Sequence, residues 1–160
     1  MNKSDIVAEI RSEARKQLSR AEANQREAQA GATHEETRAE NDKDTRAIEA
    51  QYLSRGLAER VLEWQEAVAS LENMTTNSVA EGTAISLCTL IEVEDEGGKA
   101  RRYFLAPAGA GLKIGTSEGT VMVITPKSPL GRVLLGARLD DEVVLKSPKG
   151  QQTLIVTAIA

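Results

Sequence analysis

The chain has 160 residues, with 20 Lys and Arg against 24 Asp and Glu, so its formal net charge is -4, and it contains no long basic run. This balance argues against a basic surface that neutralises phosphates, so we do not expect the free protein to bind nucleic acid. No stretch approaches the ~20 apolar residues that cross a bilayer. The first residues also lack the apolar core of a secretory signal. We therefore expect a cytoplasmic protein with no membrane partner.

The single cysteine, Cys88, lies in an apolar run. One cysteine cannot form an internal disulfide, which suits a reducing compartment. Because no His lies near it in sequence to act as a base, we interpret Cys88 as a core residue.

The composition changes sharply near residues 75–77. Before this point the chain is rich in Ala, Glu, Arg and Gln, with glycine only at Gly31 and Gly56 and no proline. After it lie all four prolines and ten of the twelve glycines. The first block is typical of long helices and the second of strands and turns. The sequence predicts two domains, residues 1–76 and 77–160.

Apolar residues recur at helical spacing in two parts of the first domain. A stripe this rich in alanine cannot form a core alone, so the two helices must pack closely and nearly antiparallel. We predict an antiparallel coiled-coil hairpin. The first stripe is Ile6, Ile10, Ala14, Leu18 and Ala21, and the second is Ile48, Tyr52, Leu57, Val61, Trp64, Val68 and Leu71.

The predicted reversal of the hairpin is Ala30-Gly31-Ala32, because glycine adopts the left-handed conformation that ends many helices. The next four residues, Thr33-His34-Glu35-Glu36, match a capping box in which Thr33 would begin the second helix. A first helix over residues 4–29 would extend about 39 Å at ~1.5 Å per residue.

The far end of this hairpin is predicted to be acidic. One interpretation is a solvated helix start, where carboxylates favour the positive end of the helix dipole. The other is that some carboxylates supply ligands to a Mg²⁺ ion held mainly by another active site, because Mg²⁺ keeps most of its waters and accepts one or two carboxylates. The candidate tip residues are Glu35, Glu36, Glu40, Asn41, Asp42 and Asp44.

The second domain is predicted to contain strands and one short helix. Ser128 and Pro129 are a capping residue and a first helical residue, and Gly136 lies beyond the end, which bounds a helix over Ser128 to Leu135. Gly97-Gly98 is a hairpin turn. The predicted strands are residues 85–93, 100–106, 121–124, 142–146 and 152–159, the last two joined by a turn at 147–150.

The run ITPKSPLGRVLLGARLDDEVVLKSPKGQQTLIVTAI, residues 124–159, resembles the C-terminal half of bacterial Gre-type (GreA/GreB) transcription elongation factors. In that family a Ser-Pro-hydrophobic-small-Arg helix precedes an acidic strand, a Pro-Gly turn and a final strand. The order of helical hairpin and then strand-rich domain agrees. The resemblance implies an α+β fold, with an N-terminal antiparallel coiled-coil hairpin followed by an FKBP-like antiparallel sheet with a short helix.

The resemblance also implies a function. The C-terminal domain would bind the rim of the RNA polymerase secondary channel while the coiled coil enters it, so nucleic acid would be met only within the elongation complex. The family's acidic tip helps the polymerase to cleave backtracked RNA, and the factor itself is not an enzyme. The residues that match the polymerase-contacting region are Ser128, Pro129, Leu130 and Arg132.

The family's tip motif is Asp-x-x-Glu-Asn. Glu40-Asn41 matches its end, but Thr37 stands where the motif has Asp. Glu36 could substitute, because a spacing of four keeps it on the same helix face as Glu40. Glu36 and Glu40 are therefore the candidate ligands of a Mg²⁺ shared with the polymerase. We expect no cofactor in the isolated protein.

Three alternatives remain open. The altered tip allows a channel-binding regulator that does not support cleavage. A prolyl isomerase or chaperone would need an aromatic-lined pocket, whereas Tyr103 and Phe104 are adjacent on a strand and so face opposite sides. A coiled-coil oligomerisation module is disfavoured by the single glycine turn, which favours closure within one chain, so we expect a monomer.

Overall fold

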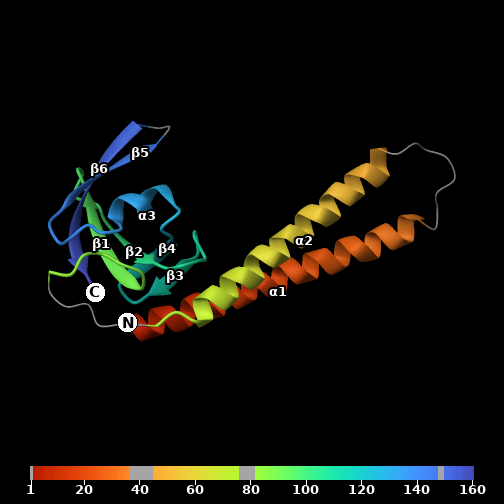
Figure 1. Ribbon diagram of the computed structural model, residues 1–160, viewed down its shortest axis with the longest axis horizontal. Coiled ribbons are helices and arrows are strands. Elements are labelled where there is room, and N and C mark those ends of the chain that lie inside the picture. The colour runs from red at the N-terminus through yellow and green to blue at the C-terminus, as the bar shows by residue number, and fades with distance from the viewer. Residues whose placement is uncertain (1, 37–44, 76–81, 148–149) are drawn as a thin grey trace.

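The structure is a computed structural model that describes residues 2–36, 45–75, 82–147 and 150–160. Two long helices, α1 (Lys3–Glu36) and α2 (Thr45–Glu72), form a hairpin that projects from a compact head (Figure 1). We call α1 and α2 the hairpin, and the described residues from 82 onward the head. No helix in the described ranges is long and apolar enough to cross a membrane.

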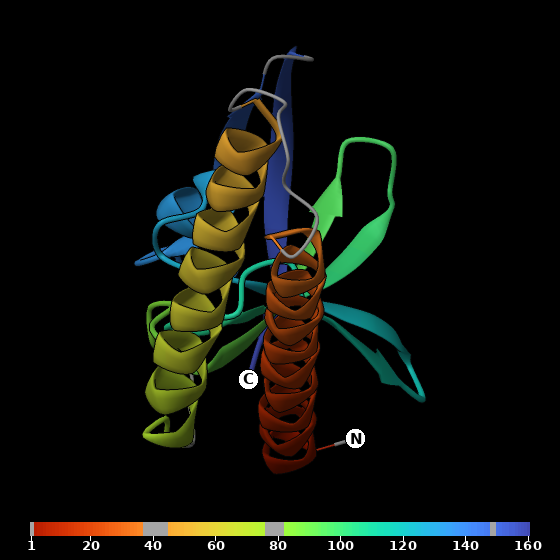
Figure 2. The same cartoon turned by 90° about the vertical axis from the view of Figure 1, so that its right-hand side faces the viewer.

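The two helices are antiparallel, as predicted. Arg15 near the start of α1 donates to a carboxylate oxygen of Glu72 at the end of α2, at 2.8 Å. Small side chains line the contact, because Ala14 is fully buried and Ala21 and Val61 are each only 7% exposed. Small residues let helix backbones approach closely, which is how an alanine-rich stripe can pack. Figure 2, which faces the far end of the hairpin, shows the helices side by side in front of the sheet.

The predicted apolar stripe of α2 does not continue to the far end. Helical spacing places Tyr52 in this stripe, but its side chain is 71% exposed. Figure 1 shows the two helices separating toward their far ends, so the close packing belongs to the half nearer the head. The prediction for Tyr52 is wrong because helical spacing identifies a face and cannot show how far a partner helix follows it.

The predicted reversal at Gly31 is also wrong. Helix α1 runs unbroken through Ala30-Gly31-Ala32 and Thr33 to Glu36, so Thr33 does not cap a second helix. A glycine inside a helix costs only about 1 kcal/mol relative to alanine, and no proline follows to end the helix. Residues 37–44, which separate α1 from α2 in the sequence, lie outside the described residues. With 34 residues, α1 extends about 51 Å at ~1.5 Å per residue, longer than expected.

The head is built on a mixed sheet with strand order β3-β4-β2-β1-β6-β5. All neighbouring strands are antiparallel except β2 and β4, which are parallel with Arg102 opposite Val121. The α+β class, with hairpin, sheet and short helix, is confirmed, and the FKBP-like relationship stays a prediction. The sheet was predicted to be antiparallel and is instead mixed, because the parallel pairing of β2 with β4 joins distant segments and leaves no local signal in the sequence. The strands are β1 (Thr89–Asp95), β2 (Ala100–Leu105), β3 (Lys113–Thr116), β4 (Gly119–Ile124), β5 (Glu142–Ser147) and β6 (Gly150–Ile159).

The sheet buries apolar side chains on both faces. Phe104 points into one core and its neighbour Tyr103 into the other, as expected for adjacent strand residues. The hairpin-side core joins Ile6, Val7, Ile10, Ala14, Leu71 and Met74 of the hairpin and its exit to Cys88, Phe104, Ala106, Leu112, Ile114, Val121 and Val123. The α3-side core contains Ile85, Ile91, Val93, Tyr103, Leu105, Ile124, Leu134, Ala137, Val143, Leu154 and Val156.

This arrangement has two consequences. Tyr103 is 7% exposed and Phe104 fully buried, so neither ring is available to an open binding pocket, which weighs against a prolyl isomerase. The hairpin is also packed into the head, because its base shares one core with the sheet. The proposed domain boundary after residue 76 lies outside the described residues and stays a prediction.

Candidate functional site

The short helix α3 (Pro129–Leu134) has the boundaries that the sequence predicted. Ser128 is extended, with φ -71 and ψ 151, and its hydroxyl accepts a hydrogen bond from the Gly131 amide at 3.1 Å. The same hydroxyl donates to the Thr125 carbonyl oxygen at 2.7 Å. Pro129 occupies the first turn, where its missing amide costs nothing. Gly136 follows the helix with φ +87, a conformation that favours glycine.

Two buried residues hold α3 against the head. Gly131 is buried against the backbone of Thr125, and Leu134 is fully buried in the α3-side core. The small residue of the Ser-Pro-hydrophobic-small-Arg pattern therefore has a packing role here. The inner side of α3 is fixed, and its outer side is presented to solvent.

The four residues predicted to contact a polymerase lie together on this helix, but they differ in exposure. Pro129 and Arg132 are exposed, whereas Ser128 and Leu130 are partly buried. Arg132 Nε donates to the Lys127 carbonyl oxygen at 3.2 Å, which orients the guanidinium along the start of the helix. Ser128 acts mainly as the cap, so Pro129 and Arg132 are the better candidates for direct contact. Their binding role stays a prediction.

Exposed apolar side chains that the sequence did not single out lie at the end of α3, in the loop after it and in a neighbouring segment. Leu87 and Leu135 are each 46% exposed and Leu139 is 49% exposed. The segment of Leu87 runs beside the end of α3, because the amide of Ile85 donates to the Ala137 carbonyl oxygen at 2.7 Å. We use the name α3 surface for the exposed residues of α3, of the loop after it and of this neighbouring segment: Pro129, Arg132, Leu135, Leu139 and Leu87. The pattern of apolar and polar residues along the sequence could not reveal this surface. The segment of Leu87 and the residues around the end of α3 are distant in sequence and meet only in the folded chain.

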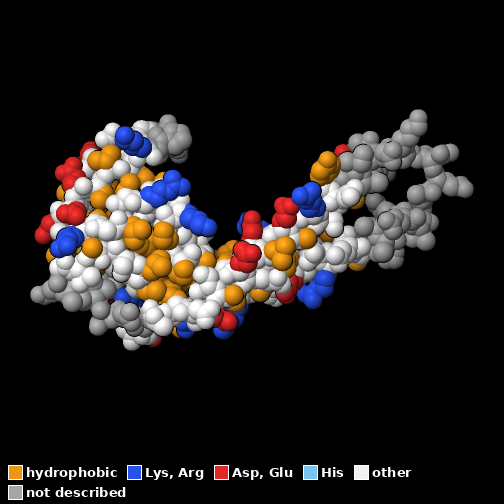
Figure 3. Space-filling view, in the orientation of Figure 1, with side chains coloured by type: hydrophobic (Ala, Val, Ile, Leu, Met, Phe, Trp, Pro, Cys, Tyr) orange, Lys and Arg blue, Asp and Glu red, His pale blue; other side chains and the backbone are white. Residues whose placement is uncertain are grey.

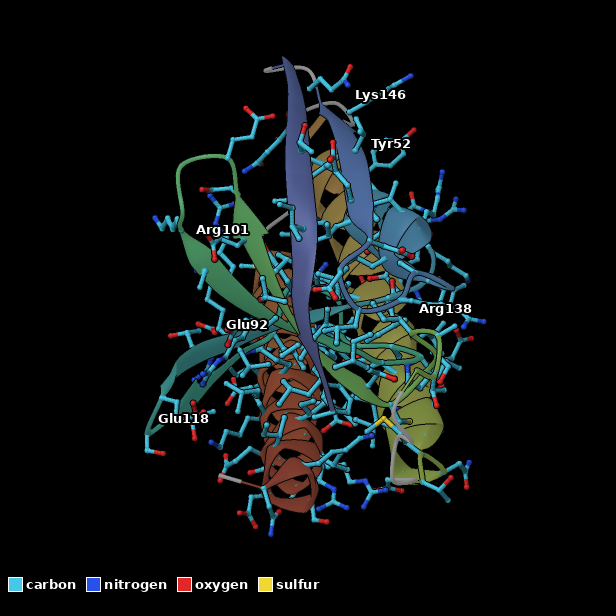
Figure 4. The ribbon with its side chains drawn as sticks, turned by 90° about the vertical axis from the view of Figure 1, so that its left-hand side faces the viewer. Tyr52, Glu92, Arg101, Glu118, Arg138 and Lys146 are labelled. Atoms are coloured by element: carbon cyan, nitrogen blue, oxygen red, sulfur yellow. The ribbon has the colours of Figure 1, made fainter. Side chains whose placement is uncertain are left out.

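Charges are distributed unevenly over the head. Figure 3 shows Lys and Arg side chains on the side of the head that faces the hairpin, whereas acidic side chains, with a basic one among them, lie on the side away from it. Arg138 extends from the head, whereas Glu92 and Glu118 lie toward the opposite side (Figure 4).

The carboxylates of Glu92 and Glu118 both pair with Arg102. Arg102 Nε donates to a carboxylate oxygen of Glu92 at 2.7 Å, and Nη1 donates to Glu118. These hydrogen bonds raise the pKa of the Arg102 guanidinium.

Cys88 is a core residue, as predicted. Its side chain is 9% exposed and belongs to the hairpin-side core. Burial raises the pKa of the Cys88 thiol, and the nearby charges of Lys3 and Arg11 partly oppose this effect. A buried thiol with a raised pKa is a poor nucleophile, so Cys88 has no place in a reactive site.

The structure describes the backbone of only two of the acidic tip residues. Glu35 and Glu36 are the last two residues of α1, and Glu40, Asn41, Asp42 and Asp44 lie outside the described residues. The interpretation of a helix start does not hold for Glu35 and Glu36, because they end a helix and its C-terminus carries the negative end of the dipole. Within the described ranges, no three His, Cys, Asp or Glu side chains gather into a metal-binding group.

Comparisons with known proteins agree on one family. Residues 80–160 match the family model described as "Transcription elongation factor, GreA/GreB, C-term". Transcription elongation factor GreA of Nitratidesulfovibrio vulgaris is 28% identical over 128 residues, which cover 78% of this chain and 76% of that protein. Transcription inhibitor protein Gfh1 of Thermus thermophilus is 33% identical over 98 residues, covering 58% of this chain and 60% of Gfh1.

Two solved structures are similar to this chain at low sequence identity. A structure of the transcription factor Gfh1 covers 93% of this chain and 92% of its own, at 24% identity and a TM-score of 0.41. A GreA/GreB factor from Nitrosomonas europaea covers 61% of this chain and 78% of its own, at 17% identity and a TM-score of 0.39.

Proposed function

The chain belongs to the GreA/GreB family of transcription elongation factors, and from this premise we propose that it inserts its hairpin into the secondary channel of RNA polymerase. Factors of this family bind and modulate RNA polymerase and are not enzymes themselves. In our proposal the head docks at the rim of the channel through the α3 surface, and the tip of the hairpin reaches the active centre. The chain acts as a monomer and meets nucleic acid only inside the elongation complex.

The observation that carries this proposal is the shape of the hairpin. Helix α1 extends about 51 Å at ~1.5 Å per residue, and only its first part is needed for packing on the head. Toward the far end Tyr52 and Leu53 are 71% and 59% exposed, so the distal part of α2 is not covered by the head. A rod of this length, fixed at one end and acidic at the other, suits insertion into a narrow channel.

The tip supplies carboxylates in this proposal. A Mg²⁺ ion held mainly by the polymerase would polarise the RNA phosphate and lower the pKa of the attacking water. Glu36 and Glu40 are the residues of this chain that would add oxygen ligands, and one or two suffice because Mg²⁺ keeps several waters.

A second candidate function is inhibition of the polymerase by occupying the channel without supporting cleavage. Two observations favour it: Thr37 stands where the family motif has Asp, and relatives at 33% identity are named transcription inhibitor protein Gfh1. The docking surface and the reach of the hairpin are the same in both functions. Only the chemistry at the tip differs.

A backtracked elongation complex made with RNA polymerase from the same organism separates these functions. Under the first proposal the protein binds and shortens the RNA, and Glu36→Ala or Glu40→Ala abolishes shortening but not binding. Asp44→Ala tests whether a further acidic side chain of the tip contributes to shortening. Glu66→Ala removes an exposed carboxylate nearer the head and is the matched control. Binding that lowers transcript yield without shortening supports the inhibitor. No binding at all refutes both.

The docking half of the proposal needs its own variant. Arg132→Ala removes the exposed guanidinium of the α3 surface and should weaken binding to the polymerase. Lys99→Ala removes a positive charge from the exposed β1–β2 turn and should leave binding unchanged. Equal loss of affinity in the two variants would mean that only the total charge matters, and that α3 is not the docking site.

A further inference from the structure

The joint between hairpin and head contains a side chain that neither the sequence nor the family comparison singles out. The last carbonyl groups of a helix have no partners within it, and α2 ends at Glu72. Arg11 of α1 reaches these carbonyls. Its Nε donates to Leu71 O at 3.0 Å, and its Nη2 donates to Glu72 O at 3.2 Å and to Met74 O at 2.6 Å.

The residues that Arg11 binds are those that connect the hairpin to the head. The Leu71 side chain is fully buried and Met74 is 6% exposed, and both belong to the hairpin-side core. Arg11 therefore holds the backbone of a segment whose side chains enter the head. A guanidinium suits this task because its donors form a rigid planar fork. Its positive charge is also favourable at the C-terminus of a helix.

Apolar packing alone leaves room at this joint. A cleft of about 380 Å³ lies beside Arg11, lined by Ser4, Val7, Met74 and Thr75 in addition to Arg11 itself. The direction of the hairpin thus depends on the shared core and on the polar contacts around it. The neighbouring ion pair of Arg15 with Glu72 is a weaker constraint, because its two side chains are 59% and 48% exposed.

We propose that Arg11 is a positioning residue that fixes the direction of the hairpin relative to the head. By binding the carbonyl groups of Leu71 and Glu72 at the end of α2 and of Met74 just beyond it, Arg11 holds the exit of the chain in one place. A rotation of about 5° at the base would move the end of a rod of about 50 Å by about 4 Å. The consequence for the tip inside a docked polymerase rests on the proposed function. The effect on hairpin direction does not.

The first test uses the free protein. Spin labels on Leu53→Cys in α2 and Thr157→Cys in β6, both exposed positions, report the distance between hairpin and head, with Cys88→Ala as the background. Arg11→Met keeps an unbranched apolar stem and removes all three hydrogen bonds, so the distance distribution should broaden. Arg15→Met removes only the exposed ion pair and should leave the distribution as in the parent.

A conservative variant keeps the test decisive if Arg11→Met fails to fold by circular dichroism. Arg11→Lys retains the charge but replaces the planar fork by a compact ammonium group. It should fold and give a distribution of intermediate width. Unchanged distributions in both folded Arg11 variants, or equal broadening in Arg15→Met, would overturn the proposal.

The second test adds the polymerase. Arg11→Met should bind RNA polymerase with the affinity of the parent, since the α3 surface is intact. Its tip-dependent effect on the transcript should fall by at least about tenfold, because a misplacement of about 1 Å can lower a catalysed rate by about 100-fold. An undiminished effect with a broadened distribution would show that hairpin direction is unimportant. A parent protein that does not bind polymerase refutes the proposed function instead, and the distance test then decides the role of Arg11.

Discussion

A Cβ atom on Gly131 would lie 2.0 Å from the carbonyl oxygen of Thr125 and 2.7 Å from its carbonyl carbon. Helix α3 is thus packed directly on the chain that leads into it, and the backbone offers no flexible side chain that could move aside. The third residue of α3 has to be glycine for the helix to lie where it does. This contact holds α3 against the backbone of Thr125.

We predict that Gly131→Ala destabilises the head. Overpacking a buried site usually costs about 1–3 kcal/mol, and this contact belongs at the upper end because it involves backbone. Urea unfolding would measure the loss, and polymerase affinity should fall with it. Gly115→Ala is the control, since a Cβ there meets no atom within 4 Å. Equal stability of the two variants would contradict the packing account of α3.

Ser128→Ala should destabilise α3 through the loss of its cap. The hydroxyl both accepts from Gly131 and donates to Thr125, so alanine leaves two backbone groups without this partner. The expected cost is about 1 kcal/mol in thermal or urea unfolding. Ser128→Thr retains a hydroxyl and should recover most of the loss. If threonine were as damaging as alanine, the hydroxyl would not be the source of the stability.

Substitution of Gly31 tests where the hairpin reverses. Because α1 is continuous through this residue, Gly31→Ala should raise the unfolding free energy by up to about 1 kcal/mol. Gly56→Ala in α2 is the matched comparison, as its Cβ would meet nothing within 4 Å. A destabilising Gly31→Ala beside a stabilising Gly56→Ala would indicate a left-handed turn at Gly31 and restore the reversal predicted from the sequence.

The Cys88 thiol should make stability depend on pH in the alkaline range. Burial raises its pKa in the folded state above the value of about 8.5 in an unfolded chain. The contribution of the neutral thiol to the free energy of unfolding is therefore complete below about pH 8.5. It is lost as the pH rises through the pKa of the folded state, because the thiol of the unfolded chain ionises first. Between about pH 8 and about pH 10, the urea midpoint should therefore fall further for the parent than for Cys88→Ala. Parallel falls would contradict this.

Local patterns in the sequence were sufficient for most of the fold. Helical spacing predicted both arms of the hairpin, and Ser128, Pro129 and Gly136 bounded α3 as observed. Each of these signals lies within a few residues. The reversal at Gly31 was wrong because a glycine can end a helix or be tolerated inside one, and only the packing of the chain decides between the two.

Features that depend on distant residues could not be predicted. Strand β3 has only four residues and contains Gly115, so it carries no alternation of its own, and it is held by pairing with β4. The parallel pairing of β2 with β4 is equally invisible in the sequence. The candidate site shows the same limit. Arg132 lies in a local motif and could be predicted, whereas Leu87 is distant from α3 in the sequence and could not. The contacts of Arg11 with α2 span 60 residues or more, and no local motif marks them.

The central claim is that the tip of the hairpin reaches the interior of RNA polymerase while α3 docks outside. A photo-crosslinking residue in place of Asn41 at the tip, compared with one in place of Glu66 nearer the head, measures this in an elongation complex. The account predicts that the tip residue crosslinks to polymerase segments or RNA at the active centre, and that the residue at position 66 does not. Crosslinks from the tip to the outer surface of the polymerase alone would contradict it.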